Sequence, residues 1–159
     1  MANKYWLFKS EPNAFSIDDL QNSPGEKTYW DGVRNYQARN FIRDEMRKGD
    51  GVLFYHSNAD PLAVVGCCKI VKAAYPDHTQ FDPDDKHFDK TAKQEDPRWF
   101  MVDIKLKEIF KHPVTLKEIK ENAKLKDFRL IQRGNRLSVF PINKKEWDEI
   151  LKMGGKKLI

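Results

Sequence analysis

One short segment carries side chains that could stack on, pair with and hydrogen-bond a flat ligand. Trp30 supplies an indole, Arg34 and Arg39 supply positive charge, Asn35 supplies an amide, and Tyr36 supplies a second ring. Together these groups provide the stacking, charge and edge hydrogen bonds with which proteins hold an unstacked nucleobase. A lone tryptophan is most often a core residue, but the crowding of these types around a helix start, which itself attracts phosphate, favours a binding role.

A second group of polar residues follows the aromatic-rich opening strand. Lys9, Ser10 and Glu11 present a cation, a hydroxyl and a carboxylate in succession, directly before Pro12. Strand ends are rigid enough to hold site residues in place. The same residues also fit a plain turn in which Pro12 fixes the backbone and Ser10 or Glu11 caps it, and from these residues alone the turn is the better interpretation.

Tyr55, His56 and Ser57 end a later strand, where a histidine beside a serine raises the question of catalysis. A nucleophile needs a base oriented by a carboxylate, yet adjacent strand residues point to opposite faces and cannot form such a dyad. A hydrolase of that kind is therefore disfavoured. One enzyme alternative remains, in which Glu11 and His56, with Asp96, transfer protons in base modification or nucleotide hydrolysis.

Neither metal binding nor a disulfide is indicated. Cys67 and Cys68 are adjacent in an apolar run, where a strand points them apart and a bond between them would be strained. We expect reduced core thiols, no metal and no cofactor, because the histidines also lack the spacing of zinc ligands. The four histidines are His56, His78, His87 and His112.

Several arginines are candidates for contacts with phosphate. Arg43 and Arg47 follow Arg39 at intervals of four and are better explained as the solvated face of a helix. Trp99, just before a strand, could be a core residue or a neighbour of the site. The phosphate candidates are Arg34, Arg39, Arg133 and Arg136. Such contacts weaken with added salt and carry little sequence information.

Composition limits the class of protein. With 159 residues, 40% of them hydrophobic and 33% charged, we expect one domain spanning 1–159 with its own core. The net charge of +5 favours an anionic partner, although 29 basic residues oppose 24 acidic ones and their distribution matters more. No apolar run is long enough for a membrane span, and the opening residues lack a signal-peptide core. We expect a monomer in the cytoplasm, or in the nucleus of a eukaryote.

Capping signals predict four helices. Ser16 opens a short helix through Leu20, and Asn35 opens an amphipathic helix from about Tyr36 to Lys48 that Gly49 ends. Capping-box pairs predict two more helices, over about 116–122 and 144–153.

The remaining pattern is that of strands. We expect strands over 52–56 and 62–73, paired antiparallel through a short polar turn, and a third over 100–109, where apolar and polar residues strictly alternate. A short opening strand and a last strand over 137–140 complete the set, and 75–97 is expected to be a long surface loop. With no alternating strand and helix rhythm, an α+β fold is favoured, with a mixed, partly closed β-barrel and flanking helices.

These segments resemble the EVE domain family over nearly the whole chain. The resemblance is carried by residues 5–12, 30–41, 54–58, 69–81 and 98–103. It implies a PUA-like barrel related to YTH domains, which hold a methylated adenine in an aromatic cage, and a reader of modified bases in DNA or RNA that performs no reaction. One departure stands out: where YTH domains draw a second tryptophan from the loop after the central strands, this loop offers Tyr75, His78, Phe81 and Phe88.

Residue by residue, the resemblance gathers one base-binding cleft. Its members would be Lys9, Ser10, Glu11, Trp30, Val33, Asn35, Tyr36, Tyr55, His56 and Ser57, with Trp99 nearby. We hypothesise that an extruded base lies on Trp30 while Ser10, Asn35 and main-chain groups read its polar edge. The partner would be nucleic acid carrying a modified base. A rival hypothesis is an adaptor whose cleft binds a protein or a small metabolite.

Overall fold

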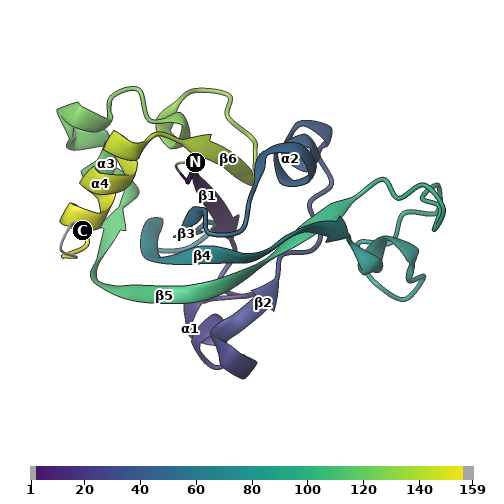
Figure 1. The fold of residues 1–159 in the computed structure, drawn as a ribbon. Coiled ribbons are helices and arrows are strands. Elements are labelled where there is room, and N and C mark those ends of the chain that lie inside the picture. The colour runs from purple at the N-terminus through teal and green to yellow at the C-terminus, as the bar shows by residue number, and fades with distance from the viewer. Residues whose placement is uncertain (1–2, 156–159) are drawn as a thin grey trace.

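Residues 3–155 are described by the computed structural model, which is a mixed α+β fold around one six-stranded sheet (Figure 1). The strands are β1 (Tyr5–Ser10), β2 (Lys27–Tyr29), β3 (Gly51–His56), β4 (Ala63–Pro76), β5 (Phe100–Thr115) and β6 (Val139–Ile142). The α-helices are α1 (Ile17–Gln21), α2 (Tyr36–Asn40), α3 (Leu116–Glu121) and α4 (Lys144–Met153). Shorter helical turns are η1 (Pro24–Glu26), η2 (Phe41–Glu45), η3 (His78–Phe81), η4 (Ala123–Leu125) and η5 (Arg129–Ile131). None of the helices in this part of the chain is long and apolar enough to cross a membrane.

The sheet runs in the order β2-β5-β4-β3-β1-β6. β1 lies parallel to β3, with Trp6 opposite Val52, and antiparallel to β6, so the sheet is mixed. β3 and β4 pair antiparallel, as the hairpin pattern predicts, and β4 and β5 form the longest pair. The strand over 100–109 is confirmed, and it extends to Thr115 because the pairing with β4 continues past the alternating segment.

The expectation of a partly closed barrel needs correction, because the sheet is open. Among the described residues, β2 pairs only with β5, and β6 only with β1. Both edge strands are short, and β6 contains Pro141, which lacks a backbone N–H and is therefore confined to sheet edges. Short edges that end in helices or turns limit further pairing. The strand β2 itself was missed, since three residues leave almost no periodicity to detect.

The helix starts follow the capping signals. Capping boxes at Ser16, Thr115 and Asn143 open α1, α3 and α4, and the side chain of Asn35 accepts a hydrogen bond from the N–H of Ala38 to open α2. The sequence predicts a second helix that reaches Lys48, but α2 ends at Asn40, and the π-helical turn η2 that follows it ends at Glu45. The wider π turn shifts the spacing of the apolar residues, so the regular helix pattern does not continue.

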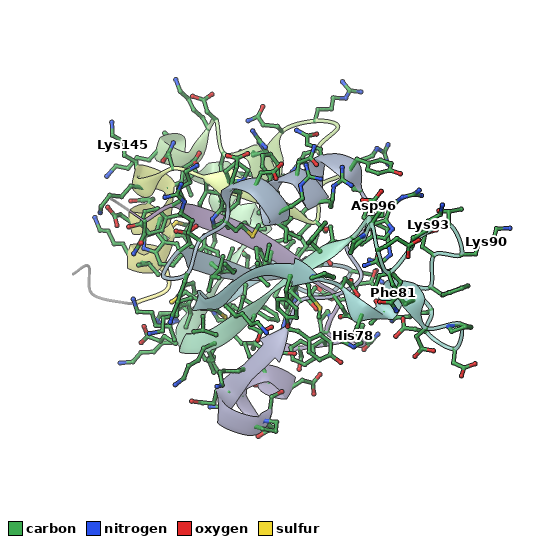
Figure 2. All side chains as sticks on the ribbon, turned by 45° about the vertical axis from the view of Figure 1, so that its right-hand side comes forward. His78, Phe81, Lys90, Lys93, Asp96 and Lys145 are labelled. Atoms are coloured by element: carbon green, nitrogen blue, oxygen red, sulfur yellow. The ribbon has the colours of Figure 1, made fainter. Side chains whose placement is uncertain are left out.

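Part of the expected loop over 75–97 belongs to regular secondary structure. β4 continues to Pro76, and η3 follows, with Asp77, Thr79 and Gln80 buried. Only the remainder, from Asp82 onward, lies outside regular elements until β5, and it projects from the sheet at the end opposite α4 (Figure 1). The side chains of Lys90 and Lys93 point outward from this projection (Figure 2). Buried polar residues are costly unless hydrogen-bonded, which explains why this turn is rigidly connected to its neighbours.

Asp50 ties the opening strand to the turn before β3. Its side chain is 2% exposed and accepts hydrogen bonds from the indole N–H of Trp6 at 2.9 Å, from the N–H of Lys4 at 3.0 Å and from the N–H of Arg47 at 2.9 Å. Every donor that meets this buried carboxylate would lose its partner if the carboxylate were removed. Cys67 and Cys68 are both buried in the same core, as expected.

Replacing Asp50 with alanine is expected to lower the free energy of unfolding by about 3 kcal/mol, because buried donors left without acceptors cost roughly 1–3 kcal/mol each. Urea denaturation followed by tryptophan fluorescence measures the change. Glu95→Ala, at an exposed position, is the control and should shift stability by less than about 0.5 kcal/mol. An Asp50→Ala protein as stable as the control would contradict this account.

Candidate functional site

A cavity of about 750 Å³ opens beside the ends of β1 and β2. One wall comes from the turn after β1, a second from the segment that follows β2, and a third from the projecting loop after η3. The lining residues are Lys9, Ser10, Glu11, Ala14, Phe15, Thr28, Tyr29, Trp30, Asp31, Gly32, Val33, Asp84, Asp85, Lys86, His87 and Ser138. Five of the predicted site residues are therefore brought together here: Lys9, Ser10, Glu11, Trp30 and Val33.

Trp30 forms the apolar wall of this cavity and is only 8% exposed. Its ring packs at 5.2 Å from Phe8 and 5.5 Å from Phe54, and Phe15 meets it edge-on at 6.4 Å. Its backbone N–H donates to the carbonyl of Val102 at 2.8 Å, which continues the β2–β5 pairing by one residue. The indole is thus fixed by both main chain and side chain, and what it presents to the cavity is a rigid surface.

The turn after β1 supplies the polar groups at the cavity's near wall. The hydroxyl of Ser10 donates to the carbonyl of Phe15 at 2.5 Å, so its oxygen keeps capacity only as an acceptor. Burial lowers the pKa of Lys9, whose ammonium lies 5.7 Å from the centre of the Phe140 ring. Glu11 is exposed at the mouth. This segment therefore forms a turn and also provides part of the cavity wall.

The far wall combines acidic groups with a histidine. Burial, together with the nearby Asp77 carboxylate, raises the pKa of Asp31, and the His87 imidazole opposes this rise. The Nδ1 atom of His87 lies 3.4 Å from Asp85 and 3.8 Å from Asp31. Gly32 has a φ of +82°, and a Cβ there would stand 2.5 Å from the His87 ring, so only glycine allows this approach.

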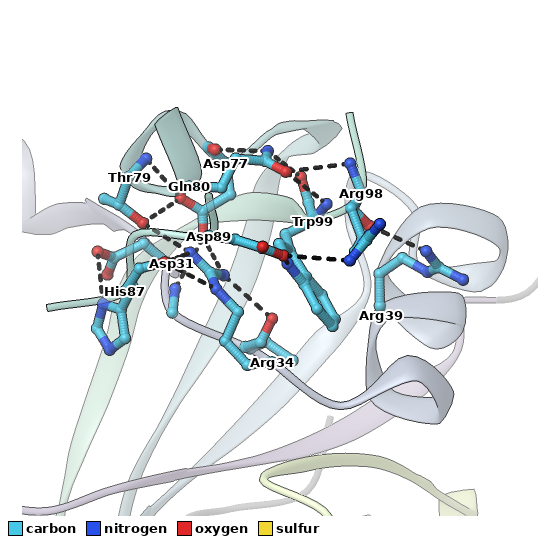
Figure 3. Close-up of polar contacts among 12 residues, drawn as sticks. Asp31, Arg34, Arg39, Asp77, Thr79, Gln80, His87, Asp89, Arg98 and Trp99 are labelled. Carbon is cyan, nitrogen blue, oxygen red and sulfur yellow. Dashed lines mark hydrogen bonds and ion pairs between the residues drawn. The ribbon is translucent and has the colours of Figure 1, made fainter. Parts of the chain in front are cut away.

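Asp77 connects this wall to the rest of the molecule (Figure 3). The buried carboxylate accepts hydrogen bonds from the N–H of Gly32 at 2.8 Å and from the N–H and hydroxyl of Thr79 at 2.8 and 2.5 Å. It also pairs with the guanidinium of Arg34 at 3.0 Å. Burial alone would raise the pKa of Asp77, but the donors of Thr79, Gly32 and Arg34 hold it below its usual value.

Gln80 connects the η3 turn to the start of β5 through hydrogen bonds. It is fully buried, its amide N–H₂ donates to the carbonyls of Asp77 and Trp99 at 2.7 and 2.8 Å, and its oxygen accepts from the N–H groups of Arg98 and Trp99. The indole N–H of Trp99 in turn donates to Asp89 at 2.8 Å (Figure 3). These contacts fold the projecting loop back against the sheet, which places 84–87 at the cavity.

Two predicted aromatic residues lie outside the cavity lining. Tyr36 is 54% exposed and stacks on the buried Trp99, with ring centroids 5.0 Å apart and planes inclined by 28°. The guanidinium of Arg39 lies 4.9 Å from the Tyr36 ring, and that of Arg34 lies 5.4 Å from the Trp99 ring. Trp99 is therefore a support for an exposed stack next to the site, and neither ring is a wall of the cavity.

The other predicted residues have structural partners. His56 accepts a hydrogen bond from the N–H of Ile17 at 3.1 Å and so caps the start of α1, while burial lowers its pKa. Burial also raises the pKa of Tyr55 to about 12. Ser57 donates its N–H to the carbonyl of Ser10, and Asn35 is the cap of α2. The Nε2 atom of His56 is occupied as an acceptor, which leaves the enzyme alternative without a free base at that atom.

The four arginines predicted to contact phosphate differ in how many hydrogen bonds their guanidinium groups already make. Arg34 is held by Asp77, by Thr79, by the carbonyl of Val33 and by two hydrogen bonds to the carbonyl of His87. Arg39 donates to Asn40 and to the carbonyl of Arg98. Arg133 and Arg136 are exposed, and the contacts of the described residues include none for their guanidinium groups.

Sequence reasoning missed the acidic far wall and the buried residues behind it. Asp77 stands one residue after Pro76 and two before Thr79, a spacing at which an aspartate bonds its own backbone two residues on. That signal points to a turn but not to a buried carboxylate. Within residues 3–155, no group of three histidine, cysteine, aspartate or glutamate side chains is arranged to hold a metal ion.

Acid is expected to release the projecting loop. Hydrogen bonds from Thr91 and Trp99 lower the pKa of Asp89 to about 2. Because the pKa of Asp89 is lower in the folded state than in the unfolded state, where it is about 3.9, the ionised carboxylate stabilises the folded loop above that pH. This contribution to stability is lost as the pH falls toward the folded pKa. The protection factors of the loop amides, which correct for the slower chemical exchange in acid, should therefore fall between about pH 4 and pH 2. In Asp89→Asn these amides should already exchange faster at neutral pH, and equal protection in both proteins would refute this role.

The EVE domain family matches residues 4–153 of the chain. Among curated proteins, thymocyte nuclear protein 1 of Gallus gallus is 43% identical over 170 residues, covering 96% of this chain and 69% of its own length. Its human counterpart is 41% identical, covering 98% of this chain and 76% of its own length.

Solved structures agree with this assignment. A hypothetical protein from Leishmania major superposes with a TM-score of 0.90 at 43% identity, covering 97% of this chain and 96% of its own. The human THYN1 protein in complex with 5-methylcytosine containing DNA superposes with a TM-score of 0.89 at 40% identity, covering 98% of this chain and all of its own. The chain therefore belongs to the EVE domain family.

Proposed function

We propose that this protein binds nucleic acid and holds one methylated base, turned out of its stack, in the cavity beside Trp30. The observation that carries the proposal is the likeness, at 40% identity, to the human THYN1 protein, whose structure is a complex with DNA that contains 5-methylcytosine. The role is that of a reader that performs no reaction. We further propose that residues 1–159 act as one EVE unit whose open sheet is a variant of the PUA-like arrangement.

The cavity has the size and the chemistry that such a ligand needs. Its volume of about 750 Å³ lies within the range of roughly 300–1,000 Å³ that is usual for small-ligand sites. The rigid Trp30 indole supplies an apolar surface for a base, and Ser10 supplies an acceptor for an exocyclic amine. The carboxylate of Asp31, which also lines the cavity, supplies further oxygens that can accept hydrogen bonds from an exocyclic amine.

A single methyl group sets the size of the preference. Burial of one methyl stabilises the complex by roughly 0.8 kcal/mol, which corresponds to about a fourfold difference in affinity. Stacking of the base itself contributes roughly 1–3 kcal/mol, whether or not the base is methylated. The protein should thus bind unmodified strands as well, and methylation of the base should raise the affinity only modestly.

Titration of short labelled oligonucleotides at fixed salt tests the proposal. A strand with 5-methylcytosine should bind about fourfold more tightly than the same strand with cytosine. Ala14→Trp, which places a bulky side chain in the cavity from an exposed position, should abolish this ratio. Trp30→Ala is less suitable, because losing the contacts with Phe8 and Phe54 would destabilise the core by roughly 3–5 kcal/mol.

Ala59→Trp is the matched control. Ala59 lines a different hollow, near the start of α3, so the same added side chain should leave the methylation ratio unchanged. Equal binding of methylated and unmodified strands by the unaltered protein, in both DNA and RNA, would count against the proposal. So would a ratio that survives in Ala14→Trp.

Arg133 and Arg136 are proposed to contact the phosphates next to the bound base. Ser138, which follows them in the chain, lines the cavity. Replacing both arginines with glutamine should reduce the slope of log affinity against log salt by about two and leave the methylation ratio intact, because each phosphate contact contributes roughly one unit. Arg34→Gln should instead lower stability, since Arg34 is paired with Asp77. An unchanged salt slope in the double variant would exclude this pair.

A further inference from the structure

Three lysines lie side by side across one face of the sheet. Lys27 of β2 pairs in register with Lys105 of β5, and Lys105 pairs in register with Lys69 of β4. Paired residues of neighbouring strands project from the same face, about 4.8 Å apart per strand. All three are exposed, while Ile104 and Ile70, the next residues along β5 and β4, are buried on the other face. We call Lys27, Lys105 and Lys69 the lysine row.

The lysine row is unfavourable for the isolated protein. Like charges directly opposite on neighbouring strands destabilise a sheet. The next pair along these strands, Lys72 of β4 and Asp103 of β5, instead combines opposite charges. Asp103 accepts a hydrogen bond from the hydroxyl of Tyr75, and the ammonium of Lys72 lies 3.9 Å from the centre of the Tyr75 ring. In the described part of the chain, the ion pairs and hydrogen bonds include none for the three ammonium groups of the row.

The row ends in a small groove of about 220 Å³. Lys69 lines it together with Lys107 and Lys144, and the rings of Tyr5 and Trp147 flank its base at Gly51. Asp148 also lines the groove and pairs with Lys144 at 2.8 Å, so the positive charge is only partly neutralised. A Cβ at Gly51 would stand 2.7 Å from the Trp147 ring. The groove thus extends the cationic surface beyond the row.

The other end of the row lies on the edge strand β2, whose next residues line the base cavity. Lys27 directly precedes Thr28 and Tyr29 in β2, and both of these residues line the cavity. Thr28 and Trp30 alternate with Lys27 and so face the other side of β2, which is the edge strand of the sheet. A polymer that placed one base beside Trp30 would therefore pass around the β2 edge to meet the row. None of the arginines considered above belongs to this surface.

We propose that the lysine row is a track for the phosphate backbone of a nucleic-acid strand that leads from the cavity toward the groove at Lys107. This inference rests on the proposed function. The ammonium groups stand on flexible stems, and a phosphate backbone offers closely spaced anions that such groups can reach without a fixed geometry. The track carries no sequence information, since it contacts phosphates and leaves the base edges unread. Its charge repulsion in the free protein is relieved when the strand binds.

Charge-neutral variants of the row provide the test. The variant Lys27→Gln, Lys69→Gln, Lys105→Gln should lower the salt slope of oligonucleotide binding by about three and weaken binding at low salt by more than about tenfold. The matched control is Lys117→Gln, Lys120→Gln, Lys124→Gln, which removes the same charge from exposed positions around α3. The control should keep the slope of the unaltered protein.

Two further measurements separate this inference from the proposed function. The row variant should keep the ratio of affinities for 5-methylcytosine and cytosine strands, whereas Ala14→Trp should lose the ratio and keep the slope. The row variant should also unfold at a higher urea concentration than the unaltered protein, because like charges have been removed.

The inference is overturned by any of three results. A row variant with the slope of the unaltered protein would show that no phosphate lies there. An equal fall in slope in the control would show an effect of net charge alone. Binding to vesicles that contain phosphatidylserine, lost in the row variant while oligonucleotide binding persists, would assign the row to a lipid surface.

Discussion

A carboxylate buried at Asp77 holds the site together. Its donors come from the segment after β2 and from the turn after β4, so one side chain fixes two stretches of chain that are distant in sequence. A buried charge is tolerated only when it is paired and hydrogen-bonded, and here the pairing is complete enough to keep the pKa of Asp77 low despite burial. The far wall of the cavity exists because this requirement pulls the loop against the sheet.

The apolar wall of the cavity, at Trp30, depends on a different kind of force. Trp30 sits at the boundary between the core and the cavity, fixed by Phe8 and Phe54 on its inner side. Apolar packing orients the ring before any ligand arrives, so binding does not have to order it. The cavity therefore combines a wall made rigid by packing with a wall made rigid by hydrogen bonds, and both are properties of the folded chain.

Local signals predicted much of the fold and only part of the site. Capping residues such as Ser16 and Asn143, and the alternation in β5, act within a few residues, and the elements they predict are confirmed. The openness of the sheet and the cavity's far wall depend on contacts across 45 or more residues, such as that of Gly32 with Asp77, which no local pattern encodes. The family resemblance places Tyr36 in the cleft, but in the structure its ring stacks on Trp99 instead.

The position of β1 in the sheet bears on how the chain reaches its native state. β1 is the first strand of this sheet in chain order, yet one of its two neighbours is β6, which begins only at Val139. Until that last strand emerges from the ribosome, an apolar strand containing Trp6, Leu7 and Phe8 has one unsatisfied edge. Such edges invite pairing with other chains. Premature termination before β6 should thus yield aggregation-prone fragments that depend on chaperones.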